Sequence, residues 1–217
     1  MDGFPLRIAG GSRALWGGVR IKGEVKTEIP KAELGDNDLV AQALKGRIAS
    51  FKELVNRYQK RTYLYARGMV HNTDDASDLS QEAFVRVYRN LRSFDDAYPF
   101  KVWLFHILAN LCKNHLRQKK YRERVMIDSD EQTYQAVSEI AGPETAVRQS
   151  EIQSAIWKAI NRLPEKFREI IILSHFQDMS YEQIAQVLDI PRGSVMSRLY
   201  YARSKLREII EEMGVEL

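Results

Sequence analysis

The spacing of apolar residues is the feature that most limits what this chain can fold into. From Asp36 onward, apolar residues recur every three or four positions, which is the pattern of a helix that buries one face. Phe51, Leu54, Val55 and Tyr58 form one such stripe. No segment shows the apolar–polar alternation of a β-strand, and no internal repeat is present. We therefore predict an all-α fold.

Breaks in this periodicity divide the chain into four parts. Residues 1–35 contain seven of the twelve glycines, and we interpret them as a mobile N-terminal extension. Residues 36–122 predict a helical domain whose long last helix ends near Lys120. Residues 123–150 are rich in Asp and Glu and predict a flexible linker, while residues 151–212 predict a second helical domain. The expected architecture is two small helical domains joined by an acidic linker.

The composition excludes several classes of protein. Cys112 is the only cysteine, so an intramolecular disulfide is impossible and a disulfide-stapled secreted fold is not expected. No apolar run approaches the ~18 residues of a membrane span, and the first thirty residues make a poor signal peptide. We therefore expect a cytoplasmic protein without membrane insertion. The net charge of +4 only weakly indicates a polyanionic partner, so the placement of the charge matters more.

The sequence lacks the motifs that indicate catalysis. It contains no P-loop, no glycine-rich dinucleotide turn, no H-E-x-x-H and no paired cysteine ligands. His106 and His115 have no third ligand at a suitable spacing, so we expect no metal site. We predict a binding protein with no catalytic residue and no cofactor.

The C-terminal domain predicts a helix-turn-helix. Ser180 and Gln183 match a capping box that starts a short helix, and Asp189 tolerates the left-handed conformation that a tight turn needs. A longer basic helix follows from Pro191, with an inner apolar stripe of Val195, Leu199, Ala202 and Leu206. Its outer face suits the major groove, although an ordinary helical hairpin with a solvated basic face is the alternative. The candidate duplex-binding residues are Arg192, Ser194, Met196, Ser197, Arg198, Tyr201, Arg203 and Lys205.

The same segment resembles a known family. Residues 163–166, 179–185 and 190–199 are similar to region 4 of the extracytoplasmic-function (ECF) sigma factors of bacterial RNA polymerase. The resemblance implies recognition of the duplex minus-thirty-five promoter element. Met196 and Tyr201 stand where many members carry Lys or Arg, which leaves the preferred promoter sequence open.

Residues 75–89 resemble region 2.2 of this family, which docks on a coiled coil of the polymerase β′ subunit. Asp75, Asp78 and Glu82 fall on one edge of a helix that we expect to follow Asn72 and to run to about Leu91. An acidic edge suits a basic partner helix, and a solvated helix start that complements the helix dipole is the alternative. The implied polymerase-binding residues are Asp75, Asp78, Leu79, Gln81, Glu82, Phe84 and Val85.

Residues 91–110 resemble regions 2.3 and 2.4, which read the melted minus-ten element in this family. The loop Phe94–Pro99 is suited to hold an extruded base, and aromatic and basic groups on the next helix suit unpaired bases and phosphates. For Phe100 and Trp103, plain core packing is the alternative. The candidate single-strand-binding residues are Phe94, Asp95, Tyr98, Trp103, His106, Asn110, Lys113, Asn114 and Arg117.

Together these resemblances cover residues 36–207 in family order. They imply a sigma factor that binds core RNA polymerase through the β′ and β subunits, directs promoter recognition and melting, and is controlled by an anti-sigma factor. The promoter DNA would be bound both as duplex and as single strand. The rival hypothesis is a helix-turn-helix transcriptional regulator that does not itself replace the sigma factor. Such a regulator would need an α/β receiver upstream, and residues 36–122 lack strand patterns.

Overall fold

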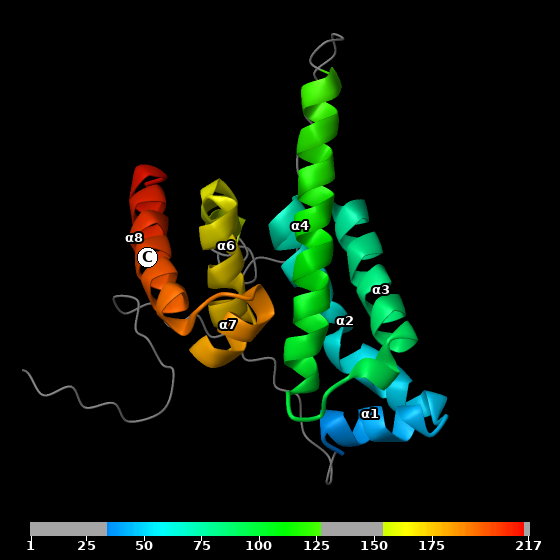
Figure 1. The fold of residues 1–217 in the computed structure, drawn as a ribbon. Helices are drawn as coiled ribbons and strands as arrows, with labels where there is room; N and C mark the ends of the chain where they lie inside the picture. Colours follow the sequence, from blue (N-terminus) through cyan, green and yellow to red (C-terminus); the bar gives the residue numbers. More distant parts are fainter. Residues whose placement is uncertain (1–33, 127–153, 215–217) are drawn as a thin grey trace, which may run out of the picture. The chain divides into compact units, whose positions relative to one another are not determined.

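The computed structural model describes residues 34–126 and 154–214. All regular secondary structure in these two ranges is helical, as the apolar spacing predicts. The elements, drawn in Figure 1, are α1 (Asp36–Leu44), α2 (Ile48–Val70), α3 (Thr73–Arg89), the short 3₁₀ helix η1 (Leu91–Ser93), α4 (Phe100–Met126), α6 (Glu165–Ile171), the π-helical turn η2 (Ile172–Phe176), α7 (Tyr181–Leu188) and α8 (Arg192–Glu212). Residues 154–162 are also helical. The predicted N-terminal extension and acidic linker lie almost wholly outside the described residues.

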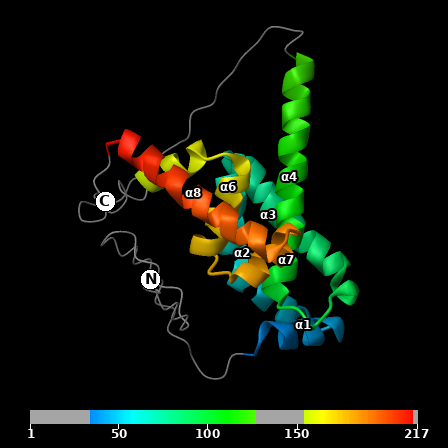
Figure 2. The ribbon, with the colours of Figure 1, turned by 60° about the vertical axis from the view of Figure 1, so that its left-hand side comes forward.

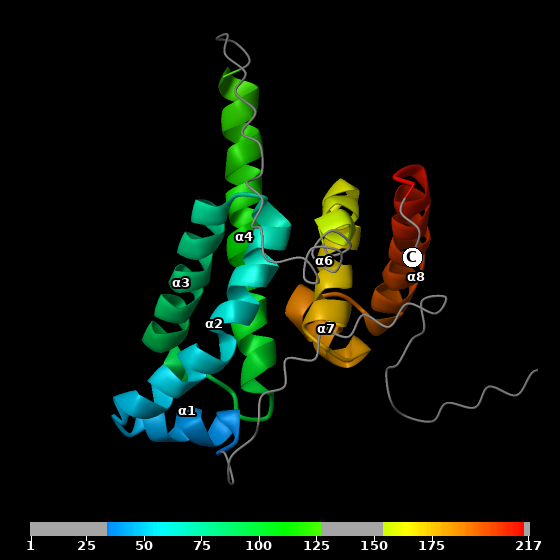
Figure 3. The same cartoon turned by 180° about the vertical axis from the view of Figure 1, so that it is seen from behind.

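Helices α2, α3 and α4 lie side by side, and α1 crosses one end of them (Figures 1 and 3). Their shared core contains Leu54, Tyr65, Leu104 and Leu108, none of which is exposed to solvent. Burial of such side chains contributes about 1.5–3 kcal/mol each, which explains why these helices need one another. The stripe predicted from Phe51 to Tyr58 is confirmed as the inward face of α2.

The boundaries of these helices follow local chemistry. His71 adopts a left-handed conformation (φ 59°) that ends α2, and Asn72 then caps α3 by accepting from the backbone N of Asp74 and Asp75 at 2.8 and 2.9 Å. Helix α4 continues to Met126, past the predicted end near Lys120. That prediction relied on loss of the apolar stripe, but Lys, Arg, Gln and Glu are good helix formers and extend a helix without one.

The C-terminal helices have the predicted helix-turn-helix order (Figure 2). The capping box is present, since Ser180 Oγ accepts from Gln183 N at 3.2 Å and Gln183 Oε1 accepts from Ser180 N at 3.0 Å. Asp189 takes the left-handed conformation (φ 53°) in the turn before α8. The inner stripe of α8 is buried at all four predicted positions, Val195, Leu199, Ala202 and Leu206.

The described residues all belong to one compact unit. Helix α4 packs against α7, and α2 packs against α6, so helices from the two predicted domains share contacts. In the part of the chain that the structure describes, no helix is both long enough and apolar enough to cross a membrane.

Candidate nucleic-acid interface

The outer face of α8 presents the predicted duplex-binding residues. Arg192, Met196, Ser197, Tyr201 and Lys205 are exposed, and Ser194, Arg198 and Arg203 are half-buried. The ring of Tyr200, which was not among the predicted residues, is the most exposed aromatic on this helix and stands 5.5 Å from the ring of Tyr201. The sequence could have indicated that Tyr200 is exposed, because Tyr200 does not belong to the apolar stripe that α8 buries. The helix therefore offers hydroxyl, guanidinium and aromatic groups to one side.

An ion pair ties the start of this face to the preceding helix. Arg192 Nε lies 2.7 Å from Glu182 Oε1, with both side chains more than half exposed. Such a surface pair is weak, at about 0–1 kcal/mol, so a phosphate can replace the carboxylate. Near the other end, Lys205 pairs with Glu208 at 2.9 Å. Arg192 and Lys205 are thus basic groups of α8 that lie on the surface.

On α4, several predicted single-strand-binding residues already have partners. Asn110 Nδ2 lies 3.1 Å from His106 Nε2, and Arg117 Nη2 donates to Asn114 Oδ1 at 3.0 Å. His106 Nδ1 lies 3.1 Å from the carbonyl oxygen of Val187 in α7. Asn110, Asn114 and Arg117 are exposed, while His106 is half-buried. These residues lie on one face of α4, which we call the α4 face. Asn110, Asn114 and Arg117 on it are exposed to solvent, whereas His106 contacts the C-terminal helices.

The predicted base-holding loop carries an aromatic cluster. Phe94 lies 5.2 Å from Trp103 and 6.1 Å from Phe100, measured between ring centroids. Phe100 is fully buried, so the core-packing alternative holds for it, whereas Trp103 stays half-buried at the edge of the cluster. Tyr98 is 45% exposed, and Asp95 turns back to accept from Ala97 N at 3.0 Å.

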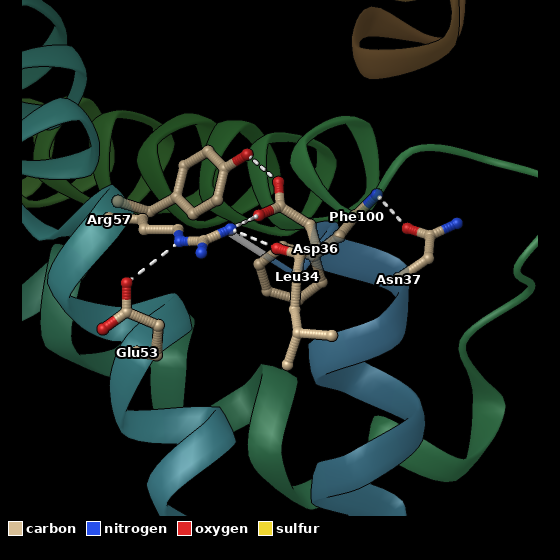
Figure 4. Close-up of polar contacts among 7 residues, drawn as sticks. Leu34, Asp36, Asn37, Glu53, Arg57 and Phe100 are labelled. Carbon is tan, nitrogen blue, oxygen red and sulfur yellow. Dashed lines mark hydrogen bonds and ion pairs between the residues drawn. The ribbon is translucent and has the colours of Figure 1, made fainter. Parts of the chain in front are cut away.

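Helix α1 fixes this loop, which the sequence did not reveal. Asn37 Nδ2 donates to the carbonyl oxygens of Asp96 (3.0 Å) and Tyr98 (3.3 Å). Its Oδ1 accepts from Phe100 N at 3.2 Å, a bond that Figure 4 shows. The last bond satisfies a backbone N–H at the start of α4 that has no partner within the helix. Asn37 lies about sixty positions before these partners, so local periodicity contains no signal for it.

Next to Asn37, a polar cluster anchors α1 to α2. Arg57 donates to Asp36 Oδ1 at 3.0 Å and to the carbonyl oxygen of Leu34 at 2.9 Å, and pairs with Glu53 at 3.0 Å (Figure 4). Tyr58 donates to the other oxygen of Asp36. Burial, followed by the hydrogen bond to this carboxylate, raises the pKa of Tyr58 well above its usual range. The phenol therefore stays a hydrogen-bond donor and holds α1 in place.

The predicted acidic edge lies on α3. Asp78 and Gln81 are exposed, Leu79 and Glu82 are half-buried, and Val85 is 41% exposed. Asp75 Oδ2 lies 3.2 Å from His115 Nε2, and Glu82 pairs with Arg86 at 2.8 Å. Phe84 is 8% exposed and belongs to the core, so it can support this edge but offers little surface to a partner.

One further charged residue stands out because it is buried. Glu169 of α6 is 3% exposed; Tyr65 donates to its Oε1 at 3.1 Å and Lys113 Nζ lies 3.1 Å from the same atom. Burial raises the pKa of Glu169, and the adjacent Lys113 ammonium opposes that rise. The sequence placed Lys113 among the single-strand-binding residues but gave no partner for it. In the sequence, the position of Glu169 within the apolar run of α6 could have indicated that this carboxylate is buried.

The fold and the outer face of α8 define a helical DNA-binding protein of the helix-turn-helix class. Two family models match the chain: Sigma-70 region 2 over residues 54–122, and Sigma-70, region 4 over residues 153–206.

Curated relatives agree over most of the chain. The ECF RNA polymerase sigma factor SigW of Bacillus subtilis is 32% identical over 179 residues, which is 80% of this chain and 96% of that protein. The ECF RNA polymerase sigma-E factor of Escherichia coli K12 is 32% identical over 186 residues, or 83% and 97% of the two chains. The chain therefore belongs to the ECF group of sigma-70-type RNA polymerase sigma factors.

Two solved structures have the same fold. CnrH in complex with the cytosolic domain of CnrY matches with a TM-score of 0.62 and 25% identity, covering 82% of this chain and 97% of that one. The sigma factor RpoE in complex with the anti-sigma factor NepR, from Bartonella quintana, matches with a TM-score of 0.62 and 27% identity, covering 74% and 96%.

Proposed function

We propose that this protein directs core RNA polymerase to promoters by dividing DNA recognition between two surfaces. The outer face of α8 binds the duplex minus-thirty-five element, while the α4 face and the loop Phe94–Pro99 hold the melted minus-ten strand. The observation that carries the proposal is the arrangement of α8, whose buried stripe leaves Ser197 and Tyr201 exposed and Arg198 half-buried beside them. Side chains on such a face reach base edges and phosphates in a major groove.

The polymerase contact is assigned to α3. Asp78 and Gln81 are exposed there beside the apolar side chain of Val85, and Glu82 is charged and partly accessible. A basic helix of the β′ subunit is the complementary partner, because opposite charges set register and speed the encounter. A second contact, from the C-terminal helices to the β subunit, is part of the same proposal.

Regulation by an anti-sigma factor also belongs to this proposal. The structurally similar RpoE was solved with the anti-sigma factor NepR. A sigma factor acts by binding and not by catalysis, and it works where RNA polymerase works, in the cytoplasm. The function proposed here therefore requires no cofactor and no catalytic residue.

Run-off transcription tests the proposal directly. Purified protein and core RNA polymerase, with no other sigma factor, are incubated with a library of genomic fragments, and the transcripts are sequenced. Defined start sites that depend on this protein support the proposal. Transcripts that appear only after a resident sigma factor is added would instead identify a helix-turn-helix regulator.

A further inference from the structure

Large apolar side chains are exposed on the outer face of α8. Met196, Tyr200 and Tyr201 are each more than half exposed, although an amphipathic helix normally turns such side chains toward the core. They are also neighbours, because Met196 and Tyr200 are one helical turn apart and the rings of Tyr200 and Tyr201 lie 5.5 Å apart. Single exposed apolar residues are common on protein surfaces, but contiguous ones mark a binding surface.

Two of these residues belong to a stripe that begins in the first turn of α8. Residues at the spacing i, i+3, i+4 and i+7 lie on one side of a helix. We call four exposed residues at this spacing the outer stripe: Gly193, Met196, Ser197 and Tyr200. In a helix-turn-helix, side chains near the start of the second helix contact base edges in the major groove. The outer stripe therefore lies on the part of α8 that is suited to reach the bases.

The outer stripe lacks the groups that most often read guanine. It contains no Arg or Lys, and the side chains of Gly193 and Met196 donate no hydrogen bond. Ser197 Oγ donates to the carbonyl oxygen of Ser194 at 3.2 Å, so its proton is used within the helix. What the stripe offers is a thioether and an aromatic ring. Apolar groups of this kind suit the C5-methyl group, which thymine presents in the major groove.

The surroundings of Met196 and Tyr200 also suit duplex DNA. Four residues of an α-helix rise by ~6 Å and base pairs follow one another at ~3.4 Å, so the two side chains can reach base pairs about two steps apart. Arg192 lies one turn before Met196, and Arg207 lies two turns after Tyr200, with both side chains exposed. Cations at both ends of the pair suit the phosphates beside the groove, which favours DNA over an apolar protein surface as the partner.

Gly193 is a second, independent observation. A Cβ atom at this position would meet nothing within 4 Å, and its φ lies outside the left-handed region, so neither packing nor backbone conformation requires glycine. Glycine nevertheless makes a helix less stable than alanine does. The absence of a side chain becomes useful when base edges lie against α8, because the helix backbone can then approach them more closely.

We propose that Met196 and Tyr200 read the C5-methyl groups of two thymines in the upstream duplex, and that Gly193 allows the close approach that this contact needs. The inference rests on the duplex-binding role of α8 proposed above and names what that face recognises. Each methyl group that is removed from water strengthens binding about fourfold. The upstream element of promoters that this protein transcribes should therefore contain thymines about two base pairs apart.

The test compares thymine with deoxyuridine, which lacks only the C5-methyl group. Holoenzyme assembled from core polymerase and this protein is titrated, by fluorescence anisotropy, against a promoter duplex that run-off transcription has identified. In a second duplex, deoxyuridine replaces the thymines of the minus-thirty-five element and no others. We expect the wild-type affinity to fall roughly fifteenfold, about fourfold for each of two methyl groups.

Three variants assign this effect to residues. Met196→Ala combined with Tyr200→Ala should bind the thymine duplex more weakly and show no difference between the two duplexes. Tyr121→Ala is the matched control, because it removes an exposed tyrosine from α4 and should keep the full difference. Gly193→Ala should bind the thymine duplex severalfold more weakly, while its melting temperature stays at or above that of the wild type, since the added Cβ meets open space.

Equal wild-type affinity for the two duplexes, or an upstream element without thymine, overturns the inference and leaves the proposed function intact. A methyl effect that persists in the double variant shows that other residues read thymine. Loss of core polymerase binding by that variant assigns Met196 and Tyr200 to a protein contact, and both of these outcomes also overturn the inference. Wild-type affinity in Gly193→Ala refutes the role given to the glycine. A wild-type holoenzyme that binds no promoter duplex and yields no transcript refutes the proposed function, and the inference falls with it.

Discussion

The side-chain amide of Asn37 joins α1 to the start of α4, because its Oδ1 accepts a hydrogen bond from the backbone N of Phe100 at 3.2 Å. The same amide donates to the carbonyl oxygens of Asp96 and Tyr98. One residue of the first helix therefore caps α4 and also holds the loop that is proposed to receive a base.

Replacing Asn37 should weaken promoter opening. Asn37→Ala removes all three bonds, so we expect a loss of about 1–2 kcal/mol of stability and reduced permanganate reactivity of the minus-ten region in the holoenzyme. Asn37→Asp keeps the acceptor for Phe100 N and loses both donors to the loop. Stability near the wild-type value with impaired opening in Asn37→Asp would assign the effect to the loop. Full opening by both variants would show that the loop does not need this anchor.

Charge reversal on α3 should abolish polymerase binding. Asp78→Lys combined with Glu82→Lys places cations where a basic partner helix is expected, and like charges repel across an interface. We expect loss of co-purification with core polymerase and an unchanged circular dichroism spectrum, since Asp78 is exposed and Glu82 makes only a surface pair with Arg86. The double variant Asp38→Lys and Glu211→Lys changes the net charge equally at exposed sites elsewhere and serves as control. Wild-type binding by the α3 variant would refute the assignment.

The pH dependence of stability should contain a contribution from His71. Burial, followed by the cations of Arg168 and Lys119, lowers the pKa of His71 to about 4, against an ordinary value of 6.5. The fold favours the neutral ring, so this contribution is complete above pH 6.5 and is lost as the pH falls toward 4. The effect is modest because the surface of His71 is exposed to solvent, which screens the ring from the nearby cations.

His71→Asn isolates this contribution. Asn tolerates the left-handed conformation at this position and does not titrate. The melting temperature of His71→Asn should therefore fall less between pH 7 and pH 5 than that of the wild type. Identical slopes for the two proteins would mean that other groups control the acid sensitivity.

Local chemistry explains which elements could be predicted from the sequence. The stripe Val195 to Leu206 predicts the inner face of α8, and the cap residues Ser180 and Asn72 predict helix starts, because each signal spans only a few positions. The packing of α6 on α2 could not be predicted, because Gly68 and Ile172 are about a hundred positions apart and no periodicity connects them.

In the candidate site, too, features that depend on local sequence could be predicted, and contacts between distant segments could not. Periodicity correctly placed Ser197 and Tyr201 on the outside of α8, since exposure follows from the position of the buried stripe. It could not show that Phe84 is buried or that Lys113 meets Glu169, because both depend on how separate helices pack. The binding roles of these residues remain predictions that require measurement.

The last prediction concerns the division of DNA recognition. Arg198→Ala should weaken holoenzyme binding to the duplex upstream element by ~1–3 kcal/mol if the guanidinium reads a base, and by less if it only holds a phosphate. Asn110→Ala and Arg117→Ala remove exposed groups of α4, so they should reduce permanganate reactivity of the melted strand and spare upstream binding. Anisotropy with an upstream duplex and footprinting on a promoter that the protein transcribes measure the two effects separately. Impaired strand capture in Arg198→Ala, or a loss confined to duplex binding in the α4 variants, would show that the two surfaces have been assigned to the wrong DNA.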